Sequence, residues 1–156
     1  ILDTMNFWMD NTMDNLKKII SKVDLICIND EEVIQLSGLG SLIEGAKKIL
    51  KMGPDFIIVK RGSLGSILID KSNMFECPAF PVKKVKDPTG AGDSFAGGLA
   101  GYLTKVNSSS FDEIKNAIIY ATATASFSVE EFGINGIEKI QYNDIVKRAD
   151  FINKLL

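Results

Sequence analysis

The sequence contains two short, continuous apolar runs of the kind found in strands that are buried within a sheet. They are residues 24–28 and residues 56–60, and both are rich in Ile. Between them lie segments whose apolar residues recur at helical spacing, which predicts helices between the strands. Strands separated by helices of this length indicate a layered α/β domain with a mostly parallel sheet.

The rest of the chain continues this pattern. A strand end is expected at residues 1–4, and residues 66–70 and 74–77 should pair as a β-hairpin around the turn at 71–73. A last short strand is expected at residues 82–86. Helices are expected at residues 10–22, 29–36, 41–52, 92–104, 112–128 and 142–154. We therefore predict one domain over residues 1–156, with the hairpin as an antiparallel element at one side of the sheet.

Composition excludes several classes of protein. The chain has 18 Lys and Arg against 20 Asp and Glu, and this balance does not suggest a nucleic-acid binder. No apolar run is long enough to cross a bilayer, and the sequence carries no secretory signal pattern. It contains no histidine, which excludes phosphohistidine relays, Ser-His triads and His-ligated zinc.

The two cysteines, Cys27 and Cys77, are too few for a disulfide scaffold. Cys27 lies in the first apolar run, so we expect it to be a buried strand residue. A cytoplasmic protein is the simplest interpretation. The chain opens at Ile1 without an initiating Met, as if within a strand, and we expect a fragment of a longer protein.

Residues 87–98, Asp-Pro-Thr-Gly-Ala-Gly-Asp-Ser-Phe-Ala-Gly-Gly, form the most specific stretch. The small residues Gly90, Ala91 and Gly92 would let backbone amides approach an anion, and a helix beginning there directs its positive end at the same point. Asp93, in the first turn, is placed to accept a proton from an attacking hydroxyl. The alternative is a tight turn followed by an acid that only stabilises the helix dipole, and a short Gly-x-Gly motif alone would favour it.

The full stretch resembles the C-terminal signature of the ribokinase (PfkB) carbohydrate-kinase family, and the order of elements resembles that family over essentially the whole chain. The resemblance implies a three-layer αβα, ribokinase-like (Rossmann-like) fold. It implies Asp93 as the catalytic base and the amides of Gly90, Ala91 and Gly92 as the anion hole for the transferred phosphoryl group. It also implies a monovalent-cation site, for K⁺, formed by Asp87, Thr89 and Gly133.

Other positions resemble the nucleotide site of the same family. Asn29 and Glu32 match an Asn-x-x-Glu motif, which would place Asn29 near the ATP phosphates and Glu32 on Mg²⁺ through water. Gly62 lies in a loop that would meet the phosphates, and Lys60, where many relatives have Thr, would either pair with phosphate or be solvated. Thr122 would belong to the adenine pocket. For Asn29 and Glu32 the alternative is a capped helix start with acids in its first turn.

The resemblance implies an ATP-dependent phosphotransferase acting on a small-molecule alcohol. A sugar is favoured, with inositol or a nucleoside as alternatives. Chains of this family are about twice as long, and their N-terminal part carries the lid and most substrate contacts. We therefore expect this fragment alone to be inactive, and the full-length protein could form a homodimer.

Three alternatives stay open. A vitamin or pyrimidine kinase of the same fold usually has Gly-Thr-Gly-Asp where this chain has Gly-Ala-Gly-Asp. A nucleotide-binding regulatory module would have no need of the base at Asp93, and a purely structural domain would need neither that acid nor the glycines. Walker and protein-kinase signatures are absent.

Overall fold

The computed structural model describes all residues, 1–156, which form two compact units. The sheet unit comprises residues Ile1–Arg61 and Ser66–Glu76, and the helical unit comprises residues Gly62–Gly65 and Cys77–Leu156. The prediction of a single domain over residues 1–156 stays a prediction.

The sheet unit is built on a mixed sheet whose strands follow chain order, β1-β2-β3-β4-β5. Strands β1, β2 and β3 are parallel, with Asp3 opposite Cys27 and Asn29 opposite Lys60. Strand β4 runs antiparallel to β3. Strands β4 and β5, which the sequence predicts as a hairpin, are neighbours in the sheet. The strand bounds are β1 Leu2–Asp3, β2 Leu25–Asn29, β3 Phe56–Lys60, β4 Ser66–Ile69 and β5 Met74–Cys77.

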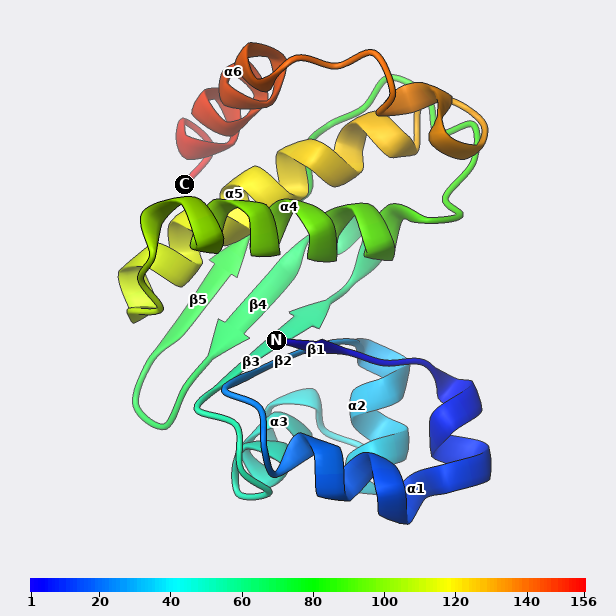
Figure 1. Cartoon of the computed structure of the whole chain (residues 1–156), viewed down its shortest axis with the longest axis vertical. Coiled ribbons are helices and arrows are strands. Elements are labelled where there is room, and N and C mark those ends of the chain that lie inside the picture. Colours follow the sequence, from blue (N-terminus) through cyan, green and yellow to red (C-terminus); the bar gives the residue numbers. More distant parts are fainter. The chain divides into compact units, whose positions relative to one another are not determined.

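Three helices connect the parallel strands, and they lie together within the sheet unit (Figure 1). They are α1 Asn6–Ile20, α2 Asp30–Ser37 and α3 Leu42–Leu50. Helix α2 packs on α3, and α3 packs on β3. The fully buried side chains of this core include Ile20, Ile26, Val33, Ile49 and Ile57, so the apolar runs and the helical stripes meet as predicted.

The helical unit contains α4 Ala91–Val106, α5 Phe111–Ser128 and α6 Tyr142–Asn153, with short 3₁₀ turns η1 Gly62–Leu64 and η2 Gly133–Gly136. Helix α4 lies along α5, and α6 packs against α5 (Figure 1). Gly98 makes the close approach of α4 to α5 possible, because a Cβ added there would lie 3.0 Å from Ala121 Cα. Ser110 caps α5 by accepting a hydrogen bond from the amide of Glu113 at 3.2 Å.

The strand expected at residues 82–86 does not form. Pro81 offers no N–H to a ladder, and residues 83–86 are exposed. The amide of Lys86 instead donates to the carbonyl of Val129, just after α5, at 2.8 Å. The end of a helix, and not a neighbouring strand, therefore holds this segment.

Helix α1 begins at Asn6, four residues earlier than residue 10, where the periodicity placed it. The apolar spacing does not mark this start, because Phe7 and Trp8 stay 54% and 47% exposed and contact each other edge to face. A kink at Thr12 separates this first part from the rest of the helix.

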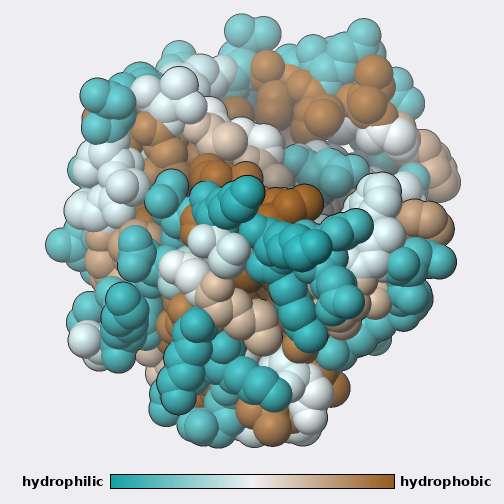
Figure 2. Space-filling model, turned by 60° about the horizontal axis from the view of Figure 1, so that its bottom comes forward, coloured by the Kyte–Doolittle hydropathy of each residue, from teal (hydrophilic) through white to brown (hydrophobic).

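Hydrophobic side chains also reach the surface elsewhere, interspersed with polar ones (Figure 2). Among the large ones are Met5, Leu64, Phe132 and Ile134. None of the helices combines the length and the apolar character that spanning a membrane would need.

Candidate active site

Asp93 lies in the first turn of α4, and its side chain is exposed. Gly90 is the N-cap residue and adopts a left-handed conformation, with φ of 78°, which a side chain would disfavour. No side chain caps this helix start. A Cβ added at Gly90 would meet nothing within 4 Å, so open space lies before the first turn. An exposed carboxylate therefore stands beside an open helix N-terminus, as the sequence predicts.

One of the three amides predicted to form an anion hole already has a partner. Ala91 N donates to the carbonyl of Pro88 at 3.2 Å, which closes the turn that leads into α4. Small residues at this turn therefore serve its geometry as well as the space in front of it. The amides of Gly90 and Gly92 stay predicted donors to an anion.

Asp87, Thr89 and Gly133 come together next to this helix start. Asp87 Oδ1 accepts a hydrogen bond from the amide of Thr89 at 2.9 Å. That bond, with the hydroxyl of Thr89 and the amide of Gly133, holds the pKa of Asp87 below its ordinary value. The amide of Asp87 also donates to the carbonyl of Val129 at 3.3 Å. The three residues predicted to hold a monovalent cation are thus neighbours, and they offer oxygen ligands.

Asn29 and Glu32 form a reciprocal capping box at the start of α2. The amide of Glu32 donates to Asn29 Oδ1, and the amide of Asn29 donates to Glu32 Oε2, both at 2.8 Å. Glu32 is only 3% exposed, and burial raises the pKa of its carboxyl above the ordinary value. The capped helix that was the alternative reading is therefore present. A role on Mg²⁺ would need the same carboxylate to serve both purposes.

Lys60 is neither solvated nor free. Its ammonium lies 3.0 Å and 2.8 Å from the two carboxylate oxygens of Asp3, and its side chain is 18% exposed. Burial alone would lower the pKa of Lys60, but the hydrogen-bonded carboxylate of Asp3 and the nearby Glu32 raise it overall. Burial raises the pKa of the Cys27 thiol to about 12, so this cysteine stays protonated.

The last two predicted nucleotide residues belong to the helical unit. Gly62 opens η1 with φ of 56°, and the space where a Cβ would point is open. Thr122 lies in α5 and is 8% exposed. Its hydroxyl is 3.8 Å from the sulfur of Cys77, so it faces the protein interior.

The predicted site residues therefore form two groups. Asn29, Glu32 and Lys60 lie at the carboxyl ends of β2 and β3 in the sheet unit, the edge where α/β sheets usually bind ligands. Asp93 and its neighbours lie in the helical unit. Sequence reasoning missed Asp3 as the partner of Lys60. The signal was available, because both residues end strands that flank β2. No cluster of three or more Asp, Glu, Cys or His side chains forms a direct metal cage.

Residues 3–140 match the family described as pfkB family carbohydrate kinase. Among curated proteins, cytidine kinase of Thermococcus kodakarensis is 37% identical over 92 residues, covering 57% of this chain and 33% of the relative. Ribokinase of Dictyostelium discoideum is 33% identical over 129 residues, covering 71% of this chain and 39% of the relative. The chain thus spans between a third and two fifths of these relatives.

A solved structure confirms the predicted fold class. Aminoimidazole riboside kinase from Salmonella enterica, complexed with aminoimidazole riboside and an ATP analog, superposes with a TM-score of 0.79 at 26% identity. The match covers 90% of this chain and 46% of that one.

Proposed function

Because the chain belongs to the pfkB family of carbohydrate kinases, we propose that it forms the ATP-binding and catalytic part of a phosphotransferase. The enzyme transfers the γ-phosphoryl group of ATP to an alcohol of a small molecule. The observation that carries this proposal is the exposed carboxylate of Asp93 beside an uncapped, unobstructed helix N-terminus. The attacking hydroxyl needs a base, and the negative charge on the transferred phosphoryl group needs hydrogen-bond donors. This turn offers both within four residues, 90–93.

In this mechanism Asp93 accepts the proton of the attacking hydroxyl. The amides of Gly90 and Gly92 and the positive end of α4 face the charge on the transferred group. Most of the catalytic effect comes from positioning and charge stabilisation, because phosphoryl transfer has a loose transition state. When bound, ATP with Mg²⁺ supplies the phosphoryl group and neutralises its charge.

The remaining predicted residues orient the nucleotide. Asn29, Lys60, Gly62 and Thr122 contribute to the ATP site, and Glu32 acts on Mg²⁺ through water. Lys60 would exchange its partner Asp3 for phosphate, or hold Asp3 in place while phosphate binds elsewhere. The oxygen-rich grouping of Asp87, Thr89 and Gly133 suits K⁺, which we propose as an activating monovalent cation.

We propose a sugar hydroxyl as the acceptor, either on a free sugar or within a nucleoside. The names of the relatives support this class, because cytidine, ribose and aminoimidazole riboside all contain a ribose. These relatives are far longer than this chain, so assays require the protein at its full natural length. We propose that the 156-residue chain alone is inactive, and that the whole enzyme works in the cytoplasm, with a homodimer as one assembly to test.

The test compares Asp93→Asn with a matched control, Asp112→Asn, in the full-length protein. Asp112 is also an exposed acid in the first turn of a helix, α5. ATP consumption is measured with Mg²⁺ against ribose, nucleosides, other sugars and inositols. Asp93→Asn should lower kcat by about 10²–10⁴-fold and leave nucleotide affinity unchanged, since the base acts only in the chemical step. Asp112→Asn should behave like the unmodified protein.

Equal turnover in Asp93→Asn and the unmodified protein would end the assignment of the base. Tight ATP binding without turnover on any acceptor would favour a non-catalytic nucleotide-binding module instead.

A further inference from the structure

Arg148, in the middle of α6, makes several side-chain contacts within the helical unit. Its guanidinium carbon lies 3.5 Å from the ring centroid of Phe127 and 4.5 Å from that of Phe80. Phe80 also contacts Phe151, which lies in α6 like Arg148. The side chain is only 17% exposed. A planar cation in contact with two aromatic rings is a geometry that favours Arg over Lys.

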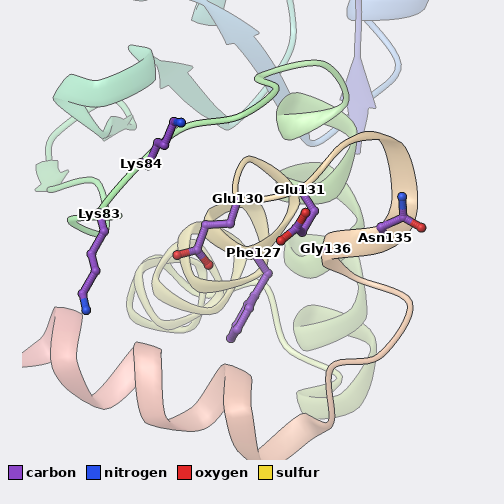
Figure 3. Close-up of a pocket in the computed structure, with 7 residues that line it drawn as sticks. All are labelled: Lys83, Lys84, Phe127, Glu130, Glu131, Asn135 and Gly136. Carbon is purple, nitrogen blue, oxygen red and sulfur yellow. The ribbon is translucent and has the colours of Figure 1, made fainter.

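The same guanidinium holds the end of α5 through hydrogen bonds. One terminal nitrogen of Arg148 donates to Ser126 Oγ at 2.7 Å, and the other forms an ion pair with Glu130. Phe127 points from α5 toward α6, and Glu130 and Glu131 follow at the end of α5, beside a pocket of about 350 Å³ (Figure 3). Arg148 therefore contacts residues on both sides of the α5 C-terminus.

The end of α5 also binds the segment Lys86–Asp87, which leads to the start of α4. The carbonyl of Val129 accepts hydrogen bonds from the amides of Lys86 at 2.8 Å and Asp87 at 3.3 Å. The ammonium of Lys86 pairs with Glu131 at 2.6 Å. Residues 126–131 thus join α6 on one side to Lys86 and Asp87 on the other.

We propose that Arg148 is a positioning residue for Asp87 and for the turn that continues to Gly90. By fixing the orientation of Val129 through Ser126 and Glu130, it sets where the Asp87 carboxylate and the α4 N-terminus lie. The inference rests on the proposed function for its effect on catalysis, but not for its effect on the segment itself. Arg148 acts on Asp87 indirectly, through its contacts at the end of α5.

Arg148→Lys keeps the charge and loses the planar stacking and the second terminal nitrogen, so it is the sharpest variant. Ile152→Val is the control, because Ile152 lies one turn further along α6 and is fully buried. This control lowers the stability of the α6 packing without touching the guanidinium contacts. Both variants are made in the full-length protein, and their thermal stabilities are measured alongside.

The first readout is hydrogen exchange at the amides of Lys86 and Asp87, normalised to amides in the middle of α4. Arg148→Lys should make this exchange about tenfold faster, because the local opening of the segment becomes easier, and Ile152→Val should leave the ratio unchanged. Equal ratios in the two variants overturn the inference. This readout decides the question even if the protein shows no kinase activity, which would contradict the proposed function alone.

The second readout is the KCl concentration that half-activates the enzyme. Arg148→Lys should raise it about tenfold and lower kcat, while KM for the acceptor stays unchanged, a coupling of ordinary size between linked sites. A purely structural role would lower thermal stability and leave the KCl dependence as it is in the unmodified enzyme. That result, in an active enzyme, also overturns the inference.

Discussion

Lys60 and Asp3 form an ion pair across β2, with the ammonium 2.8 Å and 3.0 Å from the two carboxylate oxygens. The pair links the ends of β1 and β3, which are the two neighbours of β2 in the sheet. Both side chains are largely shielded, at 18% and 26% exposed. Because water screens such a pair only in part, its loss should be measurable.

Removing both members of this pair should cost less than the sum of the two single losses. Lys60→Met leaves the Asp3 carboxylate without its partner, and we expect a loss of about 1–2 kcal/mol in the free energy of unfolding. Asp3→Asn should cost a similar amount, and the double variant less than the sum. Urea unfolding of the four proteins measures the coupling, and strictly additive losses would show that the pair contributes nothing.

Glu32 should give the protein a stability that falls as pH rises. Its folded pKa is raised above 4.5 by burial, so between 4.5 and that raised value the folded state holds more protons than the unfolded state. By linkage, the free energy of unfolding then decreases with rising pH across this window. Glu32→Gln should remove the decrease and keep the cap, since an amide oxygen still accepts the bond from Asn29.

Urea unfolding at a series of pH values from 4.5 upward tests this expectation. Glu31→Gln is the control, because Glu31 is exposed and lies next to Glu32 in the same first turn. If the free energy of unfolding of Glu32→Gln still decreases with rising pH, another group causes the decrease.

Asn29 has two roles that substitution can separate. As N-cap it accepts from the Glu32 amide at 2.8 Å, and Asn29→Ala should cost about 1 kcal/mol of stability. Asn29→Asp keeps an accepting oxygen and should retain most of that stability. It also places a negative charge where the proposed function needs ATP phosphate, so nucleotide affinity should fall. Calorimetric titration with ATP measures this affinity. If the affinity is unchanged in Asn29→Asp, Asn29 caps the helix and has no role in binding ATP.

The fold was largely predictable because each core element carries its own local pattern. The run at 56–60 coincides with β3, and the turn at 71–73 predicted the hairpin. The strand prediction for residues 82–86 was wrong because β-branched Val82 and Val85 favour a strand whether or not a neighbouring strand exists. The actual partner of this segment, the carbonyl of Val129, is distant in sequence and leaves no periodic signal.

The site was predictable where a motif is contiguous and less so where contacts are tertiary. Asp93 and Gly90 sit as the stretch at 87–98 indicates, exposed at a helix start. Predicting the ion pair of Lys60 with Asp3 would have needed the strand order. Predicting the ion pair of Arg148 with Glu130 would have needed the packing of α6 on α5. A side chain's partner across the chain depends on register, which residue types alone do not specify.

Two adjacent glycines of α4 should respond oppositely to alanine. At Gly98 the new Cβ would lie 2.8 Å from Thr124 Oγ1 and 3.0 Å from Ala121 Cα. Thr124 has little freedom to move, because its hydroxyl donates to the carbonyl of Tyr120 at 2.8 Å. Gly98→Ala should therefore destabilise by about 1–3 kcal/mol through overpacking.

At Gly97, which is exposed, an added Cβ would meet nothing within 4 Å. Gly97→Ala should stabilise the protein by about 0.5–1 kcal/mol, because alanine restricts the unfolded chain and favours a helix interior. Thermal unfolding of the two variants beside the unmodified protein measures both signs. If Gly98→Ala raised the melting temperature as Gly97→Ala should, the close approach of α4 to α5 would not depend on the missing side chain.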